Sequence, residues 1–146
     1  MYPEELVQPM REDLTRAGFR EMKDAEEVDS VLGNAKGTTL LVVNSICGCA
    51  AGKARPAVVM ALEHSNRPNQ LVTVFAGQDV EATARARAYL SGYEPSSPSI
   101  ALLLGGKPLF MLERWQIEGR PAEAIAGDLV EAFDRFCAPL NSVATP

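Results

Sequence analysis

The sequence predicts an α/β fold, a sandwich of helices around a central mixed β-sheet of about five strands. Continuously apolar runs at residues 38–45 and 70–77 are typical of strands buried on both faces, and a segment with helical spacing follows each run. A third apolar stretch, residues 99–112, is divided by Gly105-Gly106, which indicates a hairpin. Helices that alternate with buried strands, before a final hairpin and helix, are typical of this class.

The first part of the chain predicts two helices separated by a short strand. Residues 3–17 carry apolar side chains at helical spacing, and Gly18 ends that helix. Residues 19–22 are compatible with a short strand. Asp24 is the expected N-cap of the second helix, because Glu27 follows it at capping-box spacing.

Three further helices follow in the rest of the chain. A helix is expected over residues 50–64, with Pro56 kinking it or lying near its first turns. The next helix runs from residue 79 to 92. The last runs from residue 121, a proline suited to a helix start, to residue 136. Residues 138–146 are expected to form a loose tail.

Length and composition favour one domain over residues 1–146, with residues 1–17 as a helical extension. The chain has 146 residues, is 47% hydrophobic and carries a formal net charge of −5. The absence of a Lys/Arg cluster argues against nucleic acid or an anionic membrane as the main partner. No apolar run is long enough to span a bilayer, and the N-terminus lacks the apolar centre of a signal peptide, so a cytoplasmic location is expected.

The motif with the most chemical content is "NSICGCAAGKARP", in which Gly48 alone separates Cys47 from Cys49. It lies where a buried strand ends and a helix starts, the place where ligands and reactive groups gather in open α/β sheets. A helix N-terminus stabilises a thiolate, and a reducing compartment disfavours a structural disulfide. Cys47, which precedes the helix, is the expected exposed and attacking thiol, and Cys49 behind it is the expected resolving or reserve thiol.

Other interpretations of the cysteines remain open at this point. They could pack as small apolar residues, or bind metal or an iron–sulfur cluster as a carrier module, and Cys47, Cys49, Cys137 and His64 could be assembled into a four-ligand site. No second paired motif supports that site, and no metal or other cofactor is expected. A phosphate loop is disfavoured because Ala54 stands where Ser or Thr should follow the lysine. Cys137 is interpreted as a packing residue, with an accessory thiol as the alternative.

A second motif, "EPSSPSIALLL", places Pro98 directly before a buried strand. Such a proline can adopt a cis bond and leave backbone groups free at the start of the strand. A plain loop proline is the competing interpretation.

Together these features resemble the thioredoxin fold with an extra N-terminal helix. Pro98 matches the position of the cis-proline of that family, and Pro56 matches the kink in its active-site helix. The sequence resembles the bacilliredoxin family more closely. The matching segments cover nearly the whole chain in order, and they are "PMREDLTRAGF", "LVVNSICGCAAGKARPA", "VTVFAGQD", "EPSSPS" and "IEG".

The resemblance implies a thiol–disulfide oxidoreductase that removes bacillithiol from mixed disulfides with protein cysteines. General disulfide isomerase or reductase activity is the alternative that it also allows. Cys47 and Cys49 are the expected catalytic residues, and Gly48, Ser97 and Pro98 the expected substrate-binding residues. The implied partners are S-thiolated client proteins and a low-molecular-weight thiol.

The sequence departs from thioredoxin at positions that affect the mechanism. Ile46 stands where thioredoxin has Trp, no acidic residue lies within residues 38–45, and no lysine lies within residues 70–77. The buried acid–lysine pair of thioredoxin is therefore expected to be absent, which puts thioredoxin reductase in question as electron donor. Lys53 or Arg55 could attract a carboxylate-bearing thiol, or could be solvated. The clients, the electron donor and the oligomeric state stay open.

Overall fold

A five-stranded mixed sheet forms the centre of the protein in a computed structural model that describes residues 1–137. The strands lie in the order β1-β3-β2-β4-β5. β1, β3 and β2 are parallel, β4 is antiparallel to β2, and β5 is antiparallel to β4. The strands are β1 (Arg20–Glu21), β2 (Thr38–Asn44), β3 (Gln70–Phe75), β4 (Ser99–Leu104) and β5 (Lys107–Leu112). The predicted α/β fold with a mixed sheet of five strands is confirmed, whereas the predicted tail at 138–146 lies outside the described residues.

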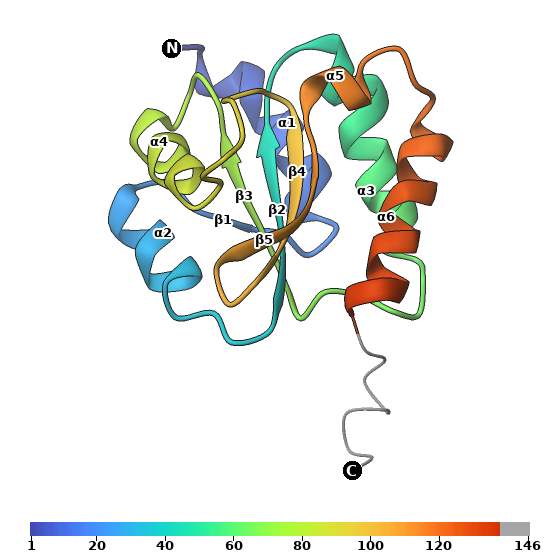
Figure 1. Ribbon diagram of the computed structural model, residues 1–146. Coiled ribbons are helices and arrows are strands. Elements are labelled where there is room, and N and C mark those ends of the chain that lie inside the picture. Colours follow the sequence, from blue (N-terminus) through green and yellow to red (C-terminus); the bar gives the residue numbers. More distant parts are fainter. Residues whose placement is uncertain (138–146) are drawn as a thin grey trace.

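Helices cover both faces of this sheet (Figure 1). α2 and α4 pack on one face, and α3 and α6 pack on the other, together with Leu14 of α1. The helical segments are α1 (Glu4–Thr15), α2 (Ala25–Leu32), η1 (Ala50–Ala54), α3 (Arg55–Ala61), α4 (Val80–Ala88), α5 (Arg114–Ile117) and α6 (Ala122–Phe136). None of the helices within residues 1–137 is long and apolar enough to cross a membrane.

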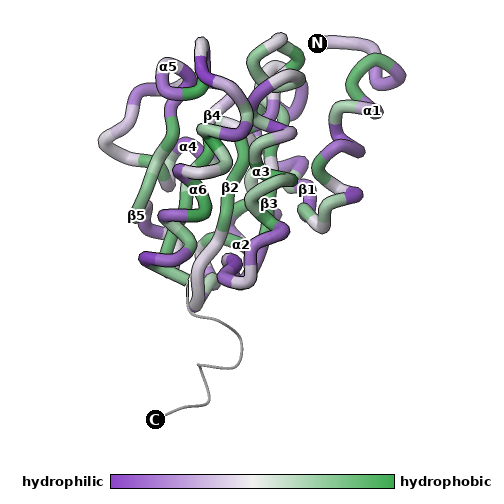
Figure 2. The backbone as a smooth tube through the Cα atoms, turned by 90° about the vertical axis from the view of Figure 1, so that its right-hand side faces the viewer, coloured by the Kyte–Doolittle hydropathy of each residue, from purple (hydrophilic) through white to green (hydrophobic). Residues whose placement is uncertain are grey.

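The buried core follows the alternation of side chains along the strands. Every residue of β2 is buried. Leu40 and Val42 point into the layer of α3 and α6, whereas Leu41 and Val43 point into the layer of α2 and α4. The three central strands β2, β3 and β4 are accordingly the apolar centre of the sheet, whereas the edge strand β1 is polar (Figure 2). This confirms that β2 is a strand buried on both faces.

The helix after the cysteines differs in detail from the expected continuous helix over residues 50–64. It begins with one π-helical turn, η1, in which the Arg55 N–H donates to the Ala50 carbonyl five residues earlier. Pro56 then lies in the first turn of α3, where its missing N–H costs least. The placement of Pro56 is confirmed, but α3 ends at Ala61. The structure also contains a short helix, α5, that the sequence pattern does not predict.

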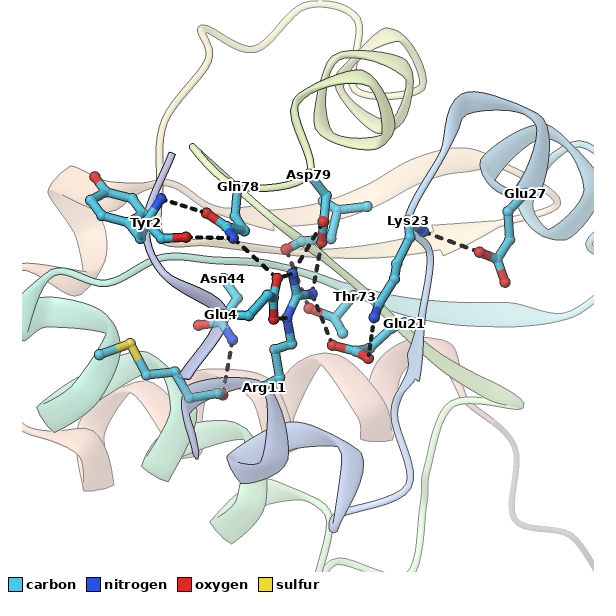
Figure 3. A network of polar contacts seen from close by, with 12 residues as sticks. Tyr2, Glu4, Arg11, Glu21, Lys23, Glu27, Asn44, Thr73, Gln78 and Asp79 are labelled. Atoms are coloured by element: carbon cyan, nitrogen blue, oxygen red, sulfur yellow. Dashed lines mark hydrogen bonds and ion pairs between the residues drawn. The ribbon is translucent and has the colours of Figure 1, made fainter. Parts of the chain in front are cut away.

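A buried cation, Arg11, is one of the contacts that attach the N-terminal helix α1 to the sheet (Figure 3). The side chain of Arg11 is only 2% exposed and pairs with Glu4, Glu21 and Asp79 at 3.0, 3.0 and 2.7 Å. Its guanidinium also lies over the ring of Phe75 at 5.3 Å. Hydrogen bonding to Asp79 is the main reason that the pKa of Arg11 is raised, so its charge is permanent. The extension is therefore an integral part of the fold.

Candidate functional site

The two neighbouring cysteines lie where β2 passes into the helical segment, as the sequence predicts. β2 ends at Asn44, and the Cys47 carbonyl accepts the N–H groups of Ala50 at 3.1 Å and Ala51 at 3.2 Å. Both thiols are unpaired and partly exposed. Exposure therefore does not distinguish Cys47 from Cys49, and the difference between them must come from ionisation.

The loop between β2 and the cysteines is fixed from beneath by Arg55. Its Nη1 donates to Asn44 Oδ1 and to the Ser45 carbonyl, both at 2.9 Å, and its Nε donates to Asp13 at 3.0 Å. Asn44 Oδ1 also accepts the Ser45 N–H at 2.9 Å. Arg55 is 4% exposed. The prediction that Arg55 could attract a substrate carboxylate is wrong, because its hydrogen bonds are committed to the scaffold.

Several groups converge on the Cys47 sulfur. Partial burial opposes ionisation of this thiol, but four favourable interactions outweigh it and place the pKa of Cys47 below its ordinary value. They come from the Ser45 hydroxyl, from the N–H groups of Ala50 and Cys49, and from the charge of Arg114. Ser45 also accepts the Cys47 N–H at 3.1 Å, which fixes the hydroxyl beside the sulfur. Cys47 is therefore the more readily ionised thiol.

Cys49 has the opposite environment. Desolvation is the main cause that raises the pKa of Cys49, and the negative charges of Cys47 and Glu118 raise it further. The positive charge of Arg114 opposes these effects. The Cys49 thiol donates to Glu118 Oε2 at 3.8 Å. The pKa values of the two thiols are therefore shifted in opposite directions, downward for Cys47 and upward for Cys49.

Pro98 reaches the same end of the sheet from β4. The Ser97–Pro98 peptide bond is cis, as the sequence pattern allows and the resemblance implies. β4 pairs antiparallel to β2 with Ser99 opposite Val43, so Pro98 lies beside the end of β2 that leads into the cysteines. Pro98 itself is buried. The structure thus brings Cys47, Cys49, Ser97 and Pro98 to one edge of the sheet.

Two further residues lie at this edge, Arg114 and Glu118, and no sequence motif identifies them as site residues. They belong to α5 and its end, which lies above the start of α3 in Figure 1. Arg114 Nη1 donates to the Ser97 carbonyl at 3.2 Å, and Arg114 Nε donates to Glu118 Oε2 at 3.1 Å. A sequence indication of α5 does exist. Glu113 and Gln116 form a capping box at its start, although glutamate is an unusual N-cap.

The four residues considered as metal ligands do not form one site, because Cys137 and His64 lie away from the two neighbouring cysteines. Cys137 is buried at the opposite end of β2, where its thiol interacts with Thr38, and burial raises its pKa. This confirms Cys137 as a packing residue. His64 bonds to Asp134 at 2.7 Å. Within residues 1–137, no three His, Cys, Asp or Glu side chains are grouped closely enough to hold a metal ion.

Comparison with known proteins agrees with this arrangement. Residues 2–137 match the family model described as disulphide isomerase. The chain is 53% identical to a bacilliredoxin of Bacillus licheniformis, with 93% of this chain and 95% of the relative aligned. It is 51% identical to bacilliredoxins of Koribacter versatilis, over 94% of both chains, and of Geobacillus kaustophilus, over 93% of this chain and 94% of the relative. The chain therefore belongs to the bacilliredoxin family and is a thiol–disulfide oxidoreductase.

Proposed function

We propose that this protein removes a low-molecular-weight thiol from mixed disulfides on protein cysteines, with Cys47 as the nucleophile. Bacillithiol is the small thiol that the resemblance implies, and S-thiolated client proteins are the proposed partners. The observation that carries the proposal is the Cys47 sulfur, whose pKa is lowered although burial opposes its ionisation, at the edge of the sheet that also holds the cis Ser97–Pro98 bond. We place the reaction in the cytoplasm, where a reducing thiol pool can regenerate the enzyme.

The proposed reaction is an exchange of disulfide bonds without net oxidation. The Cys47 thiolate attacks the sulfur of the small thiol, a new disulfide forms between Cys47 and that thiol, and the bond to the client breaks. The client sulfur leaves as a thiolate and takes up a proton from water. A second small thiol, or Cys49, then attacks the adduct and releases Cys47. If Cys49 attacks, the product is a Cys47–Cys49 disulfide, which an external thiol pair must reduce.

Gly48, Ser97 and Pro98 are proposed to border the incoming disulfide. A Cβ added at Gly48 would meet no atom within 4 Å outside its two chain neighbours, so the position between the two cysteines is open. Ser97 and Pro98 offer the backbone of the neighbouring strand start, and Arg114 fixes the Ser97 carbonyl. These contacts support a site open enough for a disulfide attached to a folded client.

The test is removal of bacillithiol from a client protein with a single S-thiolated cysteine, followed by intact-protein mass spectrometry. The unmodified protein and Cys49→Ser, both supplied with excess small thiol, should release the client, whereas Cys47→Ser should not. Cys137→Ser is the matched control, since it also removes one thiol, and it should act normally. Normal turnover by Cys47→Ser would exclude the proposed mechanism.

The family description favours a second candidate, a general protein disulfide isomerase or reductase. Refolding of a protein with scrambled disulfides, assayed beside the mixed-disulfide client, separates the two. Faster turnover of the protein disulfides would favour this second function. A metal or iron–sulfur carrier using Cys47 and Cys49 would instead show stoichiometric metal and no free thiols in the purified protein.

A further inference from the structure

We propose that Arg114 is a carboxylate-binding residue that selects the small thiol delivered to Cys47, and that Glu118 occupies its guanidinium while no small thiol is bound. The inference rests on the proposed function, because it requires a small thiol attached to Cys47. It assigns a substrate class, namely thiols that carry a carboxylate within reach of their sulfur.

The position of Arg114 is set by the segment that precedes the cis-proline. Its N–H donates to Ser96 Oγ at 3.3 Å, and its Nη1 donates to the Ser97 carbonyl at 3.2 Å. These two bonds join the first residue of α5 to the start of β4. The bond to Ser97 fixes the guanidinium beside the cis-proline loop, although the Arg114 side chain is 43% exposed.

The structure already shows a carboxylate bound at this place. Arg114 Nε donates to Glu118 Oε2 at 3.1 Å, and the same oxygen lies 3.8 Å from Cys49 Sγ. The guanidinium can thus hold a carboxylate within contact distance of one active-site sulfur. A carboxylate on a small thiol attached to Cys47, two residues away, can occupy the same position.

Glu118 is a replaceable occupant. Its side chain is 53% exposed, and exposed ion pairs are weak because water and salt compete with them. A substrate carboxylate held near the guanidinium by a covalent bond to Cys47 has a high effective concentration, so it competes well with Glu118.

The other basic residues considered from the sequence fit this task less well. Arg55 is buried and bonded to Asp13, Asn44 and Ser45. Lys53 lies in η1, and its ammonium lacks the planar fork with which arginine binds a carboxylate. The positive charge of Arg114, in contrast, acts on both Cys47 and Cys49.

The test compares two client mixed disulfides that differ only in charge. One carries 3-mercaptopropionic acid and the other 3-mercaptopropionamide on the same client cysteine, and kcat/KM for removal is measured for each. The unmodified protein should prefer the acid. Arg114→Met should lower this preference by about tenfold, the size expected for losing a hydrogen bond to a charged group. Any general effect of Arg114 on Cys47 reactivity cancels in the ratio of the two rates.

Three further variants sharpen the result. Glu118→Gln should raise the preference for the acid, because it removes the competing carboxylate. Arg114→Lys, which keeps the charge but loses the fork, should restore part of the preference. Lys53→Met is the matched control for loss of one positive charge, and it should keep the preference of the unmodified protein.

An unchanged preference in Arg114→Met, with both substrates still turned over, would overturn the inference and leave the proposed function intact. A loss of preference in Lys53→Met instead would move the carboxylate site to Lys53. An unchanged preference in Glu118→Gln would overturn the part assigned to Glu118. If the unmodified protein acts on neither substrate, the proposed function itself fails, and the inference fails with it.

Discussion

Two thiols separated by one glycine have different chemistry because different atoms surround them. The Cys47 sulfur interacts with a hydroxyl, two backbone N–H groups and the positive charge of Arg114, and all of these favour its thiolate. Cys49 faces the carboxylate of Glu118 and the charge of Cys47, both of which favour its protonated form. The order of ionisation therefore follows from fixed local contacts, and it supports the proposal that Cys47 is the attacking thiol.

Alkylation of the reduced protein at different pH values tests this order. Only the thiolate reacts, and both thiols are protonated at low pH. As the pH rises, Cys47 should become reactive first, because its pKa is lowered, and Cys49 should follow at higher pH, because its pKa is raised. Iodoacetamide labelling, with peptide fragment spectra to locate the label, measures both profiles. Buried Cys137 is the internal reference and should react slowest.

The order would be contradicted if the labelling midpoint of Cys49 fell at or below that of Cys47. Labelling in the intact chain is essential for this comparison, because removing Cys47 also removes part of the charge that raises the pKa of Cys49.

At the scale of elements, the buried ion pairs of Arg11 strengthen the attachment of α1 to the sheet. Arg11→Met should destabilise the fold by about 3 kcal/mol, because it leaves the largely buried carboxylate of Asp79 without its cation. Urea denaturation measures this change. Arg16→Met, at an exposed pair on the same end of the chain, should stay within about 0.5 kcal/mol of the unmodified protein. Similar losses for the two variants would show that the buried network is not what attaches α1.

The hairpin between β4 and β5 requires a glycine at position 106. Gly106 has φ +83°, and a Cβ there would lie 2.9 Å from the Leu32 carbonyl oxygen. Gly106→Ala should therefore cost about 1–2 kcal/mol or more in thermal or urea unfolding. Gly127→Ala is the opposite case, since this exposed glycine lies within α6 with open space around it, and it should stabilise by about 0.5–1 kcal/mol. Equal effects of the two alanines would contradict this account.

At the scale of the whole molecule, the sequence predicts the sheet and both helical layers well because burial leaves a periodic pattern. β2 and β3 are apolar on both faces, and the hairpin glycines interrupt the next run. The one π-helical turn before α3 leaves no such pattern. In this turn, just before a proline, backbone N–H groups bond to the carbonyl five residues earlier instead of four residues earlier. Amino-acid composition does not determine which of the two hydrogen-bond patterns forms.

The candidate site is predictable only in part for a similar reason. The close spacing of Cys47 and Cys49 indicates a reactive pair, and the position of Pro98 before a buried strand is compatible with a cis-proline. Arg114 begins a helix of four residues and Glu118 directly follows it, and both act on these thiols from more than sixty positions further along the chain. Their contact depends on how β5 and α5 return over the start of β4, which local sequence does not specify.

The central claim, attack by Cys47, is tested most directly by trapping its adduct. The Cys49→Ser protein is mixed with an S-thiolated client, quenched with acid, alkylated and mapped by mass spectrometry. The account predicts the small thiol in a disulfide with Cys47 and a free client cysteine, and no adduct on Cys47→Ser treated in the same way. An adduct that forms on Cys49 of Cys47→Ser at the rate of the unmodified protein would contradict it.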